Sequence, residues 1–447
     1  MAWSLPTETR YGVALLLCIA NAICYADRTN IGIAAPLFLP DPADRGIVLS
    51  AFFYGYILTQ IPAGHLASRI GVKSVLGVGV VVFTVFDCST IFASRSIGLL
   101  VVVRACMGCG EGVVMPSLHR FAAAWFPSQE RSTLVAVISS GTDLGTIFAL
   151  LFSPWIIRVT GGNWRVVFVF FGALSALWLF PYVRYVTSMP EDHDRISAEE
   201  QALITSTRRS NHSGPRRGGT NPVLWRTLLT NRSLWVIYAA HFAFNYSWYV
   251  LLGWLPTYIH DHLGLDLSQH PLAAALPYIC GYVGLLVWGR VSDRLLARGI
   301  RIVHVRRGMN SIGSFVPALC LYLLRYAQKP GVAIGLLSCA LFTGRACTLG
   351  FWVNMIDVGP DYAGEIMGLS NTIGTIPGIA GNLITGYILK HTQSWTIVFS
   401  VAALTSVSGG IVFAFGSTDR NVFEDPSSSD GIVLSLDEFH PSQDRTR

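Results

Sequence analysis

The chain has 447 residues, of which 52% are hydrophobic and 13% are charged. Because soluble proteins are typically about 25% charged, this composition excludes an ordinary soluble chain and indicates one that is solvated by a lipid bilayer. The net charge of +6 does not indicate nucleic-acid binding, because the basic residues lie between apolar segments and form no patch interleaved with aromatic residues. The nine cysteines lie inside the apolar segments and show no disulfide framework or metal-site spacing.

Twelve apolar stretches follow one another along the chain, each of about membrane-spanning length. They lie at residues 11–39, 46–68, 74–94, 97–121, 132–155, 165–187, 233–259, 271–290, 308–327, 331–352, 363–389 and 394–416. A polar stretch, acidic and then basic and glycine-rich, separates the first six from the last six and is typical of a linker. We therefore predict an all-α membrane protein with an N-terminal six-helix bundle at 1–188, a cytoplasmic linker at 189–231, a C-terminal six-helix bundle at 232–416 and a disordered cytoplasmic tail at 417–447.

The distribution of basic residues predicts the orientation of the chain in the membrane. Of the 32 Lys and Arg residues, 22 lie on the side that carries both termini and the linker, and seven lie in loops on the other side. The positive-inside rule places the side that is rich in Lys and Arg in the cytoplasm. The first span is not a cleaved signal peptide, because it is too long and contains Asp27 and Arg28.

The two halves share short sequence patterns. GHLASR, from Gly64 to Arg69, follows the second span, and GRVSDR, from Gly289 to Arg294, follows the eighth span 225 residues later. Together with the division into six and six, this indicates two parallel repeats, an arrangement that holds a substrate between the halves at mid-membrane. We interpret Gly64, Arg69, Asp293 and Arg294 as a gating latch at the cytoplasmic face.

The first and fourth spans contain charged residues, which are costly in a bilayer and therefore indicate function. Adjacent Asp27 and Arg28 point about 100° apart on a helix, so they cannot simply neutralise each other. We interpret Arg28 as a ligand for an anionic substrate and Asp27 as a proton or cation site; a structural ion pair with another helix is the alternative. Arg104 and Glu111, seven residues apart, share one helix face. Glu111 is the candidate for proton coupling, and Arg104 is a candidate substrate ligand that could equally tune Glu111 or lock the bundle.

Other intramembrane polar residues carry weaker signals. Asp87 and Asp143 have no evident partner, and Arg345 could add positive potential or pair with Asp357. The uncharged candidates for substrate hydrogen bonds, with packing as the alternative, are Tyr54, Asn245, Asn371 and Thr375. No phosphate-binding glycine loop or nucleophile triad is present. We therefore expect no enzyme activity, no cofactor and no metal.

Several motifs together resemble the major facilitator superfamily, and within it the anion:cation symporter family. That family includes sialin and the vesicular glutamate, type I phosphate and plant plastid anion transporters. The motifs are GHLASRIGVK, YADRTN, VRACMGCGEGVVMPSLH, WFPSQERS and VNMIDVGPDYAGEIMGLSNTIGTIPGI, and the resemblance runs from about residue 11 to residue 416. It implies twelve transmembrane helices in two pseudo-symmetric bundles, substrate-anion binding at Arg28, proton coupling at Glu111 and a role for Arg104 at the same site. Asp27 matches an acid of bacterial symporters and plant-like members, which favours cation coupling.

Two departures from the family pattern bear on the substrate. Phe244 stands about where vesicular glutamate transporters place an arginine, which argues against glutamate, and Met355 replaces a histidine common in the tenth helix. Phosphate, ascorbate-like, sugar-acid and other carboxylate substrates stay open. We expect a monomeric secondary transporter of a small anion, coupled to protons or sodium; the alternative is a receptor or scaffold on the same fold that binds without flux.

Overall fold

A computed structural model describes residues 8–127, 130–210 and 222–423 of the chain. In these ranges the chain forms helices and no strand. Nine of the helical segments there are long and apolar enough to cross a membrane. Three further helices, α2, α10 and α12, have similar lengths but contain more polar residues, as in the IVHVRRGMN start of α12. Each of the twelve predicted spans corresponds to one of these helical segments.

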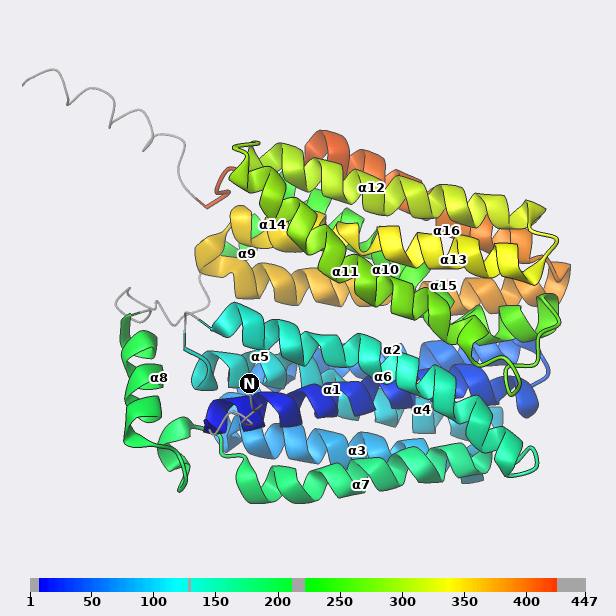
Figure 1. Cartoon of the computed structure of the whole chain (residues 1–447), viewed down its shortest axis with the longest axis horizontal. Helices are drawn as coiled ribbons and strands as arrows, with labels where there is room; N and C mark the ends of the chain where they lie inside the picture. Colours follow the sequence, from blue (N-terminus) through cyan, green and yellow to red (C-terminus); the bar gives the residue numbers. More distant parts are fainter. Residues whose placement is uncertain (1–7, 128–129, 211–221, 424–447) are drawn as a thin grey trace, which may run out of the picture.

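The helices before the linker form one group and those after it another (Figure 1). The first group contains α1 (Thr9–Ala34), η1 (Ala35–Leu37), α2 (Pro42–Ile70), α3 (Val72–Ala93), α4 (Ile97–Gly112), α5 (Val114–Trp125), α6 (Arg131–Val159) and α7 (Arg165–Tyr185). The linker contains η2 (Pro190–Asp192), α8 (Ala198–Ser210) and α9 (Pro222–Thr230). The second group contains α10 (Arg232–Thr257), η3 (Tyr258–His262), α11 (Leu272–Ala297), α12 (Ile302–Leu323), η4 (Leu324–Tyr326), α13 (Pro330–Gly344), η5 (Thr348–Trp352), α14 (Val353–Asp357), η6 (Pro360–Tyr362), α15 (Ala363–Thr392) and α16 (Trp395–Gly416).

Small residues allow the helices of the first group to pack closely. Helix α1 lies along α6, and α2 lies along α4. A Cβ atom at Gly145 of α6 would overlap the backbone carbonyl of Ala22 on α1. Because lipid supplies no hydrophobic drive for helix association, such close backbone contact is a main source of bundle stability in a membrane.

The fourth span of each half is interrupted. The first interruption separates α4 from α5 at Val113, where Gly112 is followed by Pro116, a residue that cannot donate a backbone hydrogen bond. The second lies at Arg345, between α13 and the π-helical turn η5. Interrupted helices and π-turns often mark functional sites, and both interruptions lie close to a charged residue.

The linker helix α8 is fixed to the first half through Arg10 at the start of α1. The Arg10 side chain, 4% exposed, forms ion pairs with Glu130 at 2.8 Å and with Glu200 of α8 at 3.3 Å. The hydrogen bond from Arg10 lowers the pKa of Glu130. In Figure 1, α8 and α9 lie at the same end of the molecule as the start of α1.

The start of the C-terminal tail is packed against the second half, so the predicted disordered tail does not begin at residue 417. The Arg307 guanidinium donates to Ser417, the Asn354 amide donates to the carbonyl of Thr418 at 2.8 Å, and the Val422 backbone N–H donates to the carbonyl of Val358 at 2.8 Å. The polar composition of this segment suggested disorder, but these hydrogen bonds hold its first residues against the second half. The rest of that predicted tail, residues 424–447, lies outside the described part of the chain.

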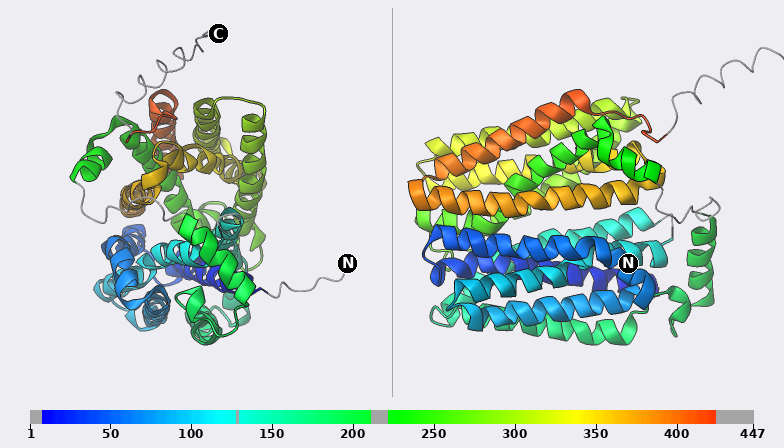
Figure 2. Two further views of the ribbon diagram at one scale, coloured as in Figure 1. Left: turned by 90° about the vertical axis from the view of Figure 1, so that its left-hand side faces the viewer. Right: turned by 180° about the vertical axis from the view of Figure 1, so that it is seen from behind.

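The two halves are in close contact at the end of the molecule away from the linker. Helices α2 and α15 cross there, and a Cβ at Gly46 would lie 2.6 Å from the backbone oxygen of Asn382. Lys390 of α15 pairs with Asp41 at 2.7 Å, and Arg45 of α2 pairs with Asp261 at 3.5 Å. The Lys390 hydrogen bond lowers the pKa of Asp41. Figure 2 shows the two groups of helices from the linker end and from behind.

Candidate functional site

The central feature of the first half is an ion pair between α1 and α4. The Arg28 Nη2 lies 2.7 Å from Glu111 Oε2, and the Nε of the same guanidinium donates to that oxygen at 3.2 Å. The two side chains are 4% and 0% exposed. The Cys24 thiol, one helical turn before Arg28, also donates to the Glu111 carboxylate at 3.0 Å. Glu111 stands in the last turn of α4, directly before the interruption at Val113.

Aromatic rings surround the Arg28 guanidinium. Its central carbon lies 4.6 Å from the ring centroids of Tyr25 and Phe52 and 4.9 Å from that of Tyr56. Such cation–π contacts contribute about 2 kcal/mol when they are desolvated, and they favour the planar guanidinium over a lysine ammonium. The Arg28 Nη1 and the Glu111 Oε1 have no hydrogen-bond partner among the described residues. The pair therefore retains an unused donor and an unused acceptor, both of them buried.

A second buried charge pair lies beside the first. The Arg104 Nη1 of α4 lies 3.6 Å from the Asp87 Oδ1 of α3, and both side chains are 1% exposed. Asp27 is also 1% exposed, and within the described ranges neither of its carboxylate oxygens has a hydrogen-bond partner. Asp27 is close enough to interact electrostatically with Asp87, Arg104 and Glu111. The structure thus brings Asp27, Arg28, Arg104 and Glu111 into one cluster and adds Asp87 to it.

Asp87 was the least expected member of this cluster. Its only signal in the sequence is an acidic residue in the middle of an apolar span, without a partner on the same helix. Because α3 and α4 run side by side, Asp87 meets Arg104 from the next helix. The described residues contain no group of three or more His, Cys, Asp or Glu side chains arranged to hold a metal ion.

The charged residues of the second half pair differently from the sequence expectation. Arg345 pairs with Asp143 of α6 and not with Asp357. Asp357 instead forms an ion pair with Arg306 of α12, whose Nε lies 2.8 Å from the Asp357 carboxylate. The correction follows from the interruption after α13, which places Arg345 at the contact with the first half.

The uncharged candidates do not join the Arg28 cluster. Tyr54 is 49% exposed and lies on the face of α2 opposite to Phe52 and Tyr56. The Asn245 amide donates to the carbonyl of Gly374 at 2.6 Å, within the contact between α10 and α15. The Thr375 hydroxyl donates to the backbone carbonyl of Asn371 at 2.7 Å within α15, and the Asn371 side chain is partly buried.

A buried histidine that the sequence did not single out belongs to the Asn245 contact. The His241 ring, 2% exposed, lies 2.8 Å from the Ser370 hydroxyl through Nδ1 and 3.1 Å from the Asn245 amide through Nε2. Two polar contacts and a stacked ring of Phe351 satisfy the imidazole. Its place suits a helix-to-helix contact.

The predicted latch residues lie at the linker end. Arg69 of α2 and Asp293 and Arg294 of α11 are exposed there. Gly64 lies within α2, and its surroundings fall outside what the structure describes. The structure therefore shows these latch residues exposed at the end opposite to the tight contact of Gly46 with α15.

Comparison with known proteins adds independent information. The family model described as Major Facilitator Superfamily matches residues 17–382. The chain is 36% identical over 423 residues to "Probable anion transporter 1, chloroplastic" of Oryza sativa subsp. japonica, covering 93% of this chain and 78% of the relative. It is 36% identical over 424 residues to "Ascorbate transporter, chloroplastic" of Arabidopsis thaliana, with 93% and 76% covered. It is 34% identical over 433 residues to "Sodium-dependent phosphate transport protein 1, chloroplastic" of the same plant, with 95% and 82% covered.

Solved structures with the same fold have low sequence identity to this chain. A D-xylose-proton symporter superposes with a TM-score of 0.68 at 15% identity, covering 92% of this chain and 98% of that one. A bacterial homolog of the human lysosomal transporter Spinster, in an inward-facing and occupied conformation, gives a TM-score of 0.69 at 16% identity, with 93% and 99% covered. At these identities the likeness concerns the fold alone.

Proposed function

This chain belongs to the Major Facilitator Superfamily, and within it to the anion:cation symporters, and on that premise we propose that it is a secondary active transporter of a small anion. It is a multi-pass integral membrane protein whose homologues are anion transporters. The single observation that carries the proposal is the buried pair of Arg28 with Glu111, because an arginine held by an internal carboxylate can exchange that carboxylate for a substrate anion.

The coupling step follows from the geometry of that pair. Arg28 donates two hydrogen bonds to one oxygen of Glu111. A proton on Glu111 removes the charge that holds the guanidinium, so the arginine becomes free to bind an incoming anion. When the anion leaves, Glu111 releases its proton and takes Arg28 back. Anion binding and proton binding thus favour each other.

The charge of the whole cluster also favours cation coupling. It contains two arginines, Arg28 and Arg104, and three acids, Asp27, Asp87 and Glu111, so full ionisation would leave one uncompensated negative charge. An unpaired charge at the centre of a bilayer costs about 2.5–3.5 kcal/mol even on the mildest scales. One bound proton or sodium ion at Asp27 would neutralise the cluster before any substrate binds. We propose that Asp27 and Glu111 together carry the coupling ion.

We further propose that the halves rock about this cluster and that the described arrangement is open toward the cytoplasm. The tight α2 and α15 contact, with Lys390 and Asp41 paired, closes the end away from the linker. The exposed Arg69, Asp293 and Arg294 lie at the linker end, which the excess of basic residues assigns to the cytoplasm. These latch residues would meet when that end closes. We place the bundle boundaries at residues 188 and 232.

The substrate class that we propose comprises inorganic phosphate and small organic carboxylates, including ascorbate-like and sugar-acid anions. The names of two relatives, an ascorbate transporter and a sodium-dependent phosphate transport protein, support this range. Arg28 and Arg104 carry the positive charge that such anions need. Neither Tyr54 nor Asn245 is among the substrate contacts that we propose.

Uptake into liposomes tests this function directly. Purified protein would be reconstituted into liposomes, and a proton gradient, a sodium gradient or no gradient would be imposed across their membrane. Uptake of labelled phosphate, ascorbate and gluconate would then be measured. We expect accumulation of at least one anion above its equilibrium level with one of the two gradients. Saturable binding of these anions without flux under any gradient would contradict transport and would favour a receptor.

A further inference from the structure

Arg345 occupies a position in the second half that resembles that of Glu111 in the first. Both residues lie at the interruption of the fourth span of their half, Glu111 just before Val113 and Arg345 just after α13. From this position the Arg345 side chain reaches the first half, where its Nη2 donates a hydrogen bond to the Oδ1 of Asp143 on α6. Asp143 is 2% exposed. A charge pair therefore joins the two halves deep inside the molecule.

The guanidinium of Arg345 lies over an aromatic ring, and one of its hydrogen-bond donors has no partner among the described residues. Its central carbon lies 4.3 Å from the ring centroid of Trp248 on α10. Stacking on an indole leaves the N–H groups of the fork pointing outward in the guanidinium plane, the geometry that binds a carboxylate. The Arg345 Nε is buried and has no hydrogen-bond partner among the described residues. The side chain thus has an unused donor beside its bond to Asp143.

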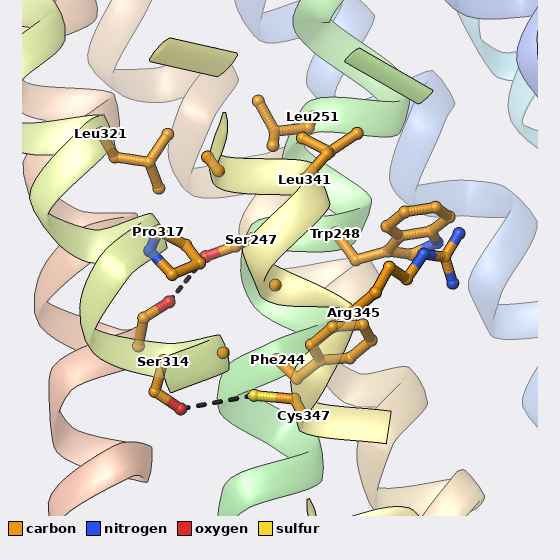
Figure 3. A pocket seen from close by; sticks show the side chains of 14 residues that line it. Phe244, Ser247, Trp248, Leu251, Ser314, Pro317, Leu321, Leu341, Arg345 and Cys347 are labelled. Carbon is orange, nitrogen blue, oxygen red and sulfur yellow. Dashed lines mark hydrogen bonds between the residues drawn. The ribbon is translucent and has the colours of Figure 1, made fainter. Parts of the chain in front are cut away.

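A cavity of about 510 Å³, including the part that is open to the surroundings, adjoins this arginine inside the second half (Figure 3). Its walls are mainly apolar and include Phe244, Trp248, Leu251, Pro317 and Leu341. The two serines that Figure 3 labels are already bonded, Ser247 to Ser406 and Ser314 to Cys347. Arg345 and Trp248 lie together at one edge of the cavity, away from Pro317 and Leu321. Among the walls of this cavity Arg345 supplies the charged group, and an apolar lining with one charged anchor suits a small organic anion.

We propose that Arg345 is a second anion ligand, specific for organic carboxylates whose apolar body fills this cavity, and that Asp143 occupies Arg345 while the substrate is absent. The inference rests on the proposed transport function and deepens it by naming a substrate class. The guanidinium selects an anion, and the apolar walls select an anion whose body carries no hydroxyl groups. Inorganic phosphate has no such body and gains nothing from the cavity.

The exchange leaves Asp143 in need of a new partner. Charged and titratable groups around it are Arg345 and Tyr278, the latter on α11, which packs against α6. The Tyr278 hydroxyl is buried and has no hydrogen-bond partner within the described ranges. Under this proposal, the Tyr278 hydroxyl donates to Asp143 when the substrate carboxylate binds Arg345, so the exchange does not leave an isolated acid.

The competing explanation is a latch, in which Arg345 and Asp143 only hold the halves together. The two explanations differ for the variant D143N/R345Q, which removes both charges. A latch made of two opposite charges tolerates their joint removal, because no unpaired charge remains. A ligand does not, because the carboxylate loses its arginine.

The test is equilibrium binding of phenylacetate to the purified full-length protein by titration calorimetry, with gluconate and inorganic phosphate as comparison anions. We expect D143N to bind phenylacetate about tenfold more tightly, because the internal competitor loses its charge. We expect R345Q and D143N/R345Q to lose phenylacetate binding. In case R345Q does not fold, A340L narrows the cavity with both charges in place, and it should weaken phenylacetate alone.

Three results would overturn the inference. The first is wild-type phenylacetate affinity in D143N/R345Q, which would establish the latch. The second is an equal effect of A340L on phenylacetate, gluconate and phosphate, and the third is no phenylacetate binding to the wild type. Liposome uptake of phosphate, ascorbate and gluconate by the wild type tests the proposed function separately, so a transporter that fails these binding tests refutes only the role of Arg345 and its cavity.

Discussion

The substitution Glu111→Gln removes the charge of the internal anion and keeps its size. Glutamine still offers a carbonyl oxygen to Arg28, so the α1 and α4 contact can persist. The bound proton is no longer needed to release the guanidinium. We therefore expect the variant to bind substrate anion more tightly than the wild type at neutral pH and to lose proton-driven accumulation, while anion exchange continues.

The structure gives the size of this effect. Arg28 donates two hydrogen bonds to the charged oxygen of Glu111, and replacing a charged acceptor by a neutral one weakens such bonds by about 1–2 kcal/mol in total. Because about 1.4 kcal/mol corresponds to a factor of ten, affinity for the anion should rise about tenfold. In the wild type, affinity should rise as the pH falls, since protonation of Glu111 frees Arg28. In Glu111→Gln this pH dependence should be absent.

The assay is binding of labelled phosphate and gluconate between pH 5 and pH 8, followed by uptake with and without a proton gradient. Asp357→Asn is the matched control, because Asp357 forms an arginine pair of the same chemistry in the other half, 2.8 Å from Arg306. We expect this control to keep the wild-type pH dependence of binding. Unchanged affinity and unchanged pH dependence in Glu111→Gln would refute the exchange of Arg28 between Glu111 and substrate.

Three further substitutions probe the surroundings of the site. Asp87→Asn leaves Arg104 buried without its acid, and breaking such a pair costs about 3–5 kcal/mol. Thermal unfolding in detergent should show a lower Tm, and adding Arg104→Gln should restore part of the loss. An unchanged Tm in Asp87→Asn would contradict the pair. Gly46→Val places methyl groups against the backbone of Asn382, because even a Cβ at this position would lie 2.6 Å from the Asn382 carbonyl oxygen. The end away from the linker should therefore open, and maleimide should label Thr257→Cys faster in a background without native cysteines. Equal labelling would contradict the close contact. The hydrogen bond from Lys390 lowers the pKa of Asp41 from 3.8, so the ionised carboxylate stabilises the fold above pH 3.8 and this stabilisation is lost as the pH falls toward the lowered pKa. The difference in Tm between the wild type and Asp41→Asn should therefore shrink between pH 6 and pH 3. A difference that stays constant would show that the ion pair is not the source of the stabilisation.

The membrane-spanning helices were predictable because hydropathy and length decide them. The structure forms a helix at each predicted span, and the family confirms the twelve-helix fold. The interruptions of the fourth and tenth spans were not predicted, although Gly112 and Pro116 were visible in the sequence. A hydropathy profile does not register a single interrupted turn, since apolar residues continue through it.

Partners across the bundle were the least predictable part of the site. Arg28 and Glu111 were both predicted as functional, and the structure pairs them over 83 positions of sequence. Arg345 was expected either to add positive potential or to pair with Asp357, whereas it pairs with Asp143, 202 positions away in the sequence. Sequence spacing identifies residues that share a helix face, but it does not identify which neighbouring helix supplies the counter-charge.

The central claim is that Arg28 binds the transported anion, and uptake by Arg28→Ala tests it most directly. Labelled anion uptake would be measured in liposomes that contain equal amounts of correctly inserted wild-type and variant protein, with Asp357→Asn as the control for a lost ion pair. The account predicts no uptake above empty liposomes for Arg28→Ala and measurable uptake for the control. Wild-type uptake by Arg28→Ala would contradict the assignment of the substrate site.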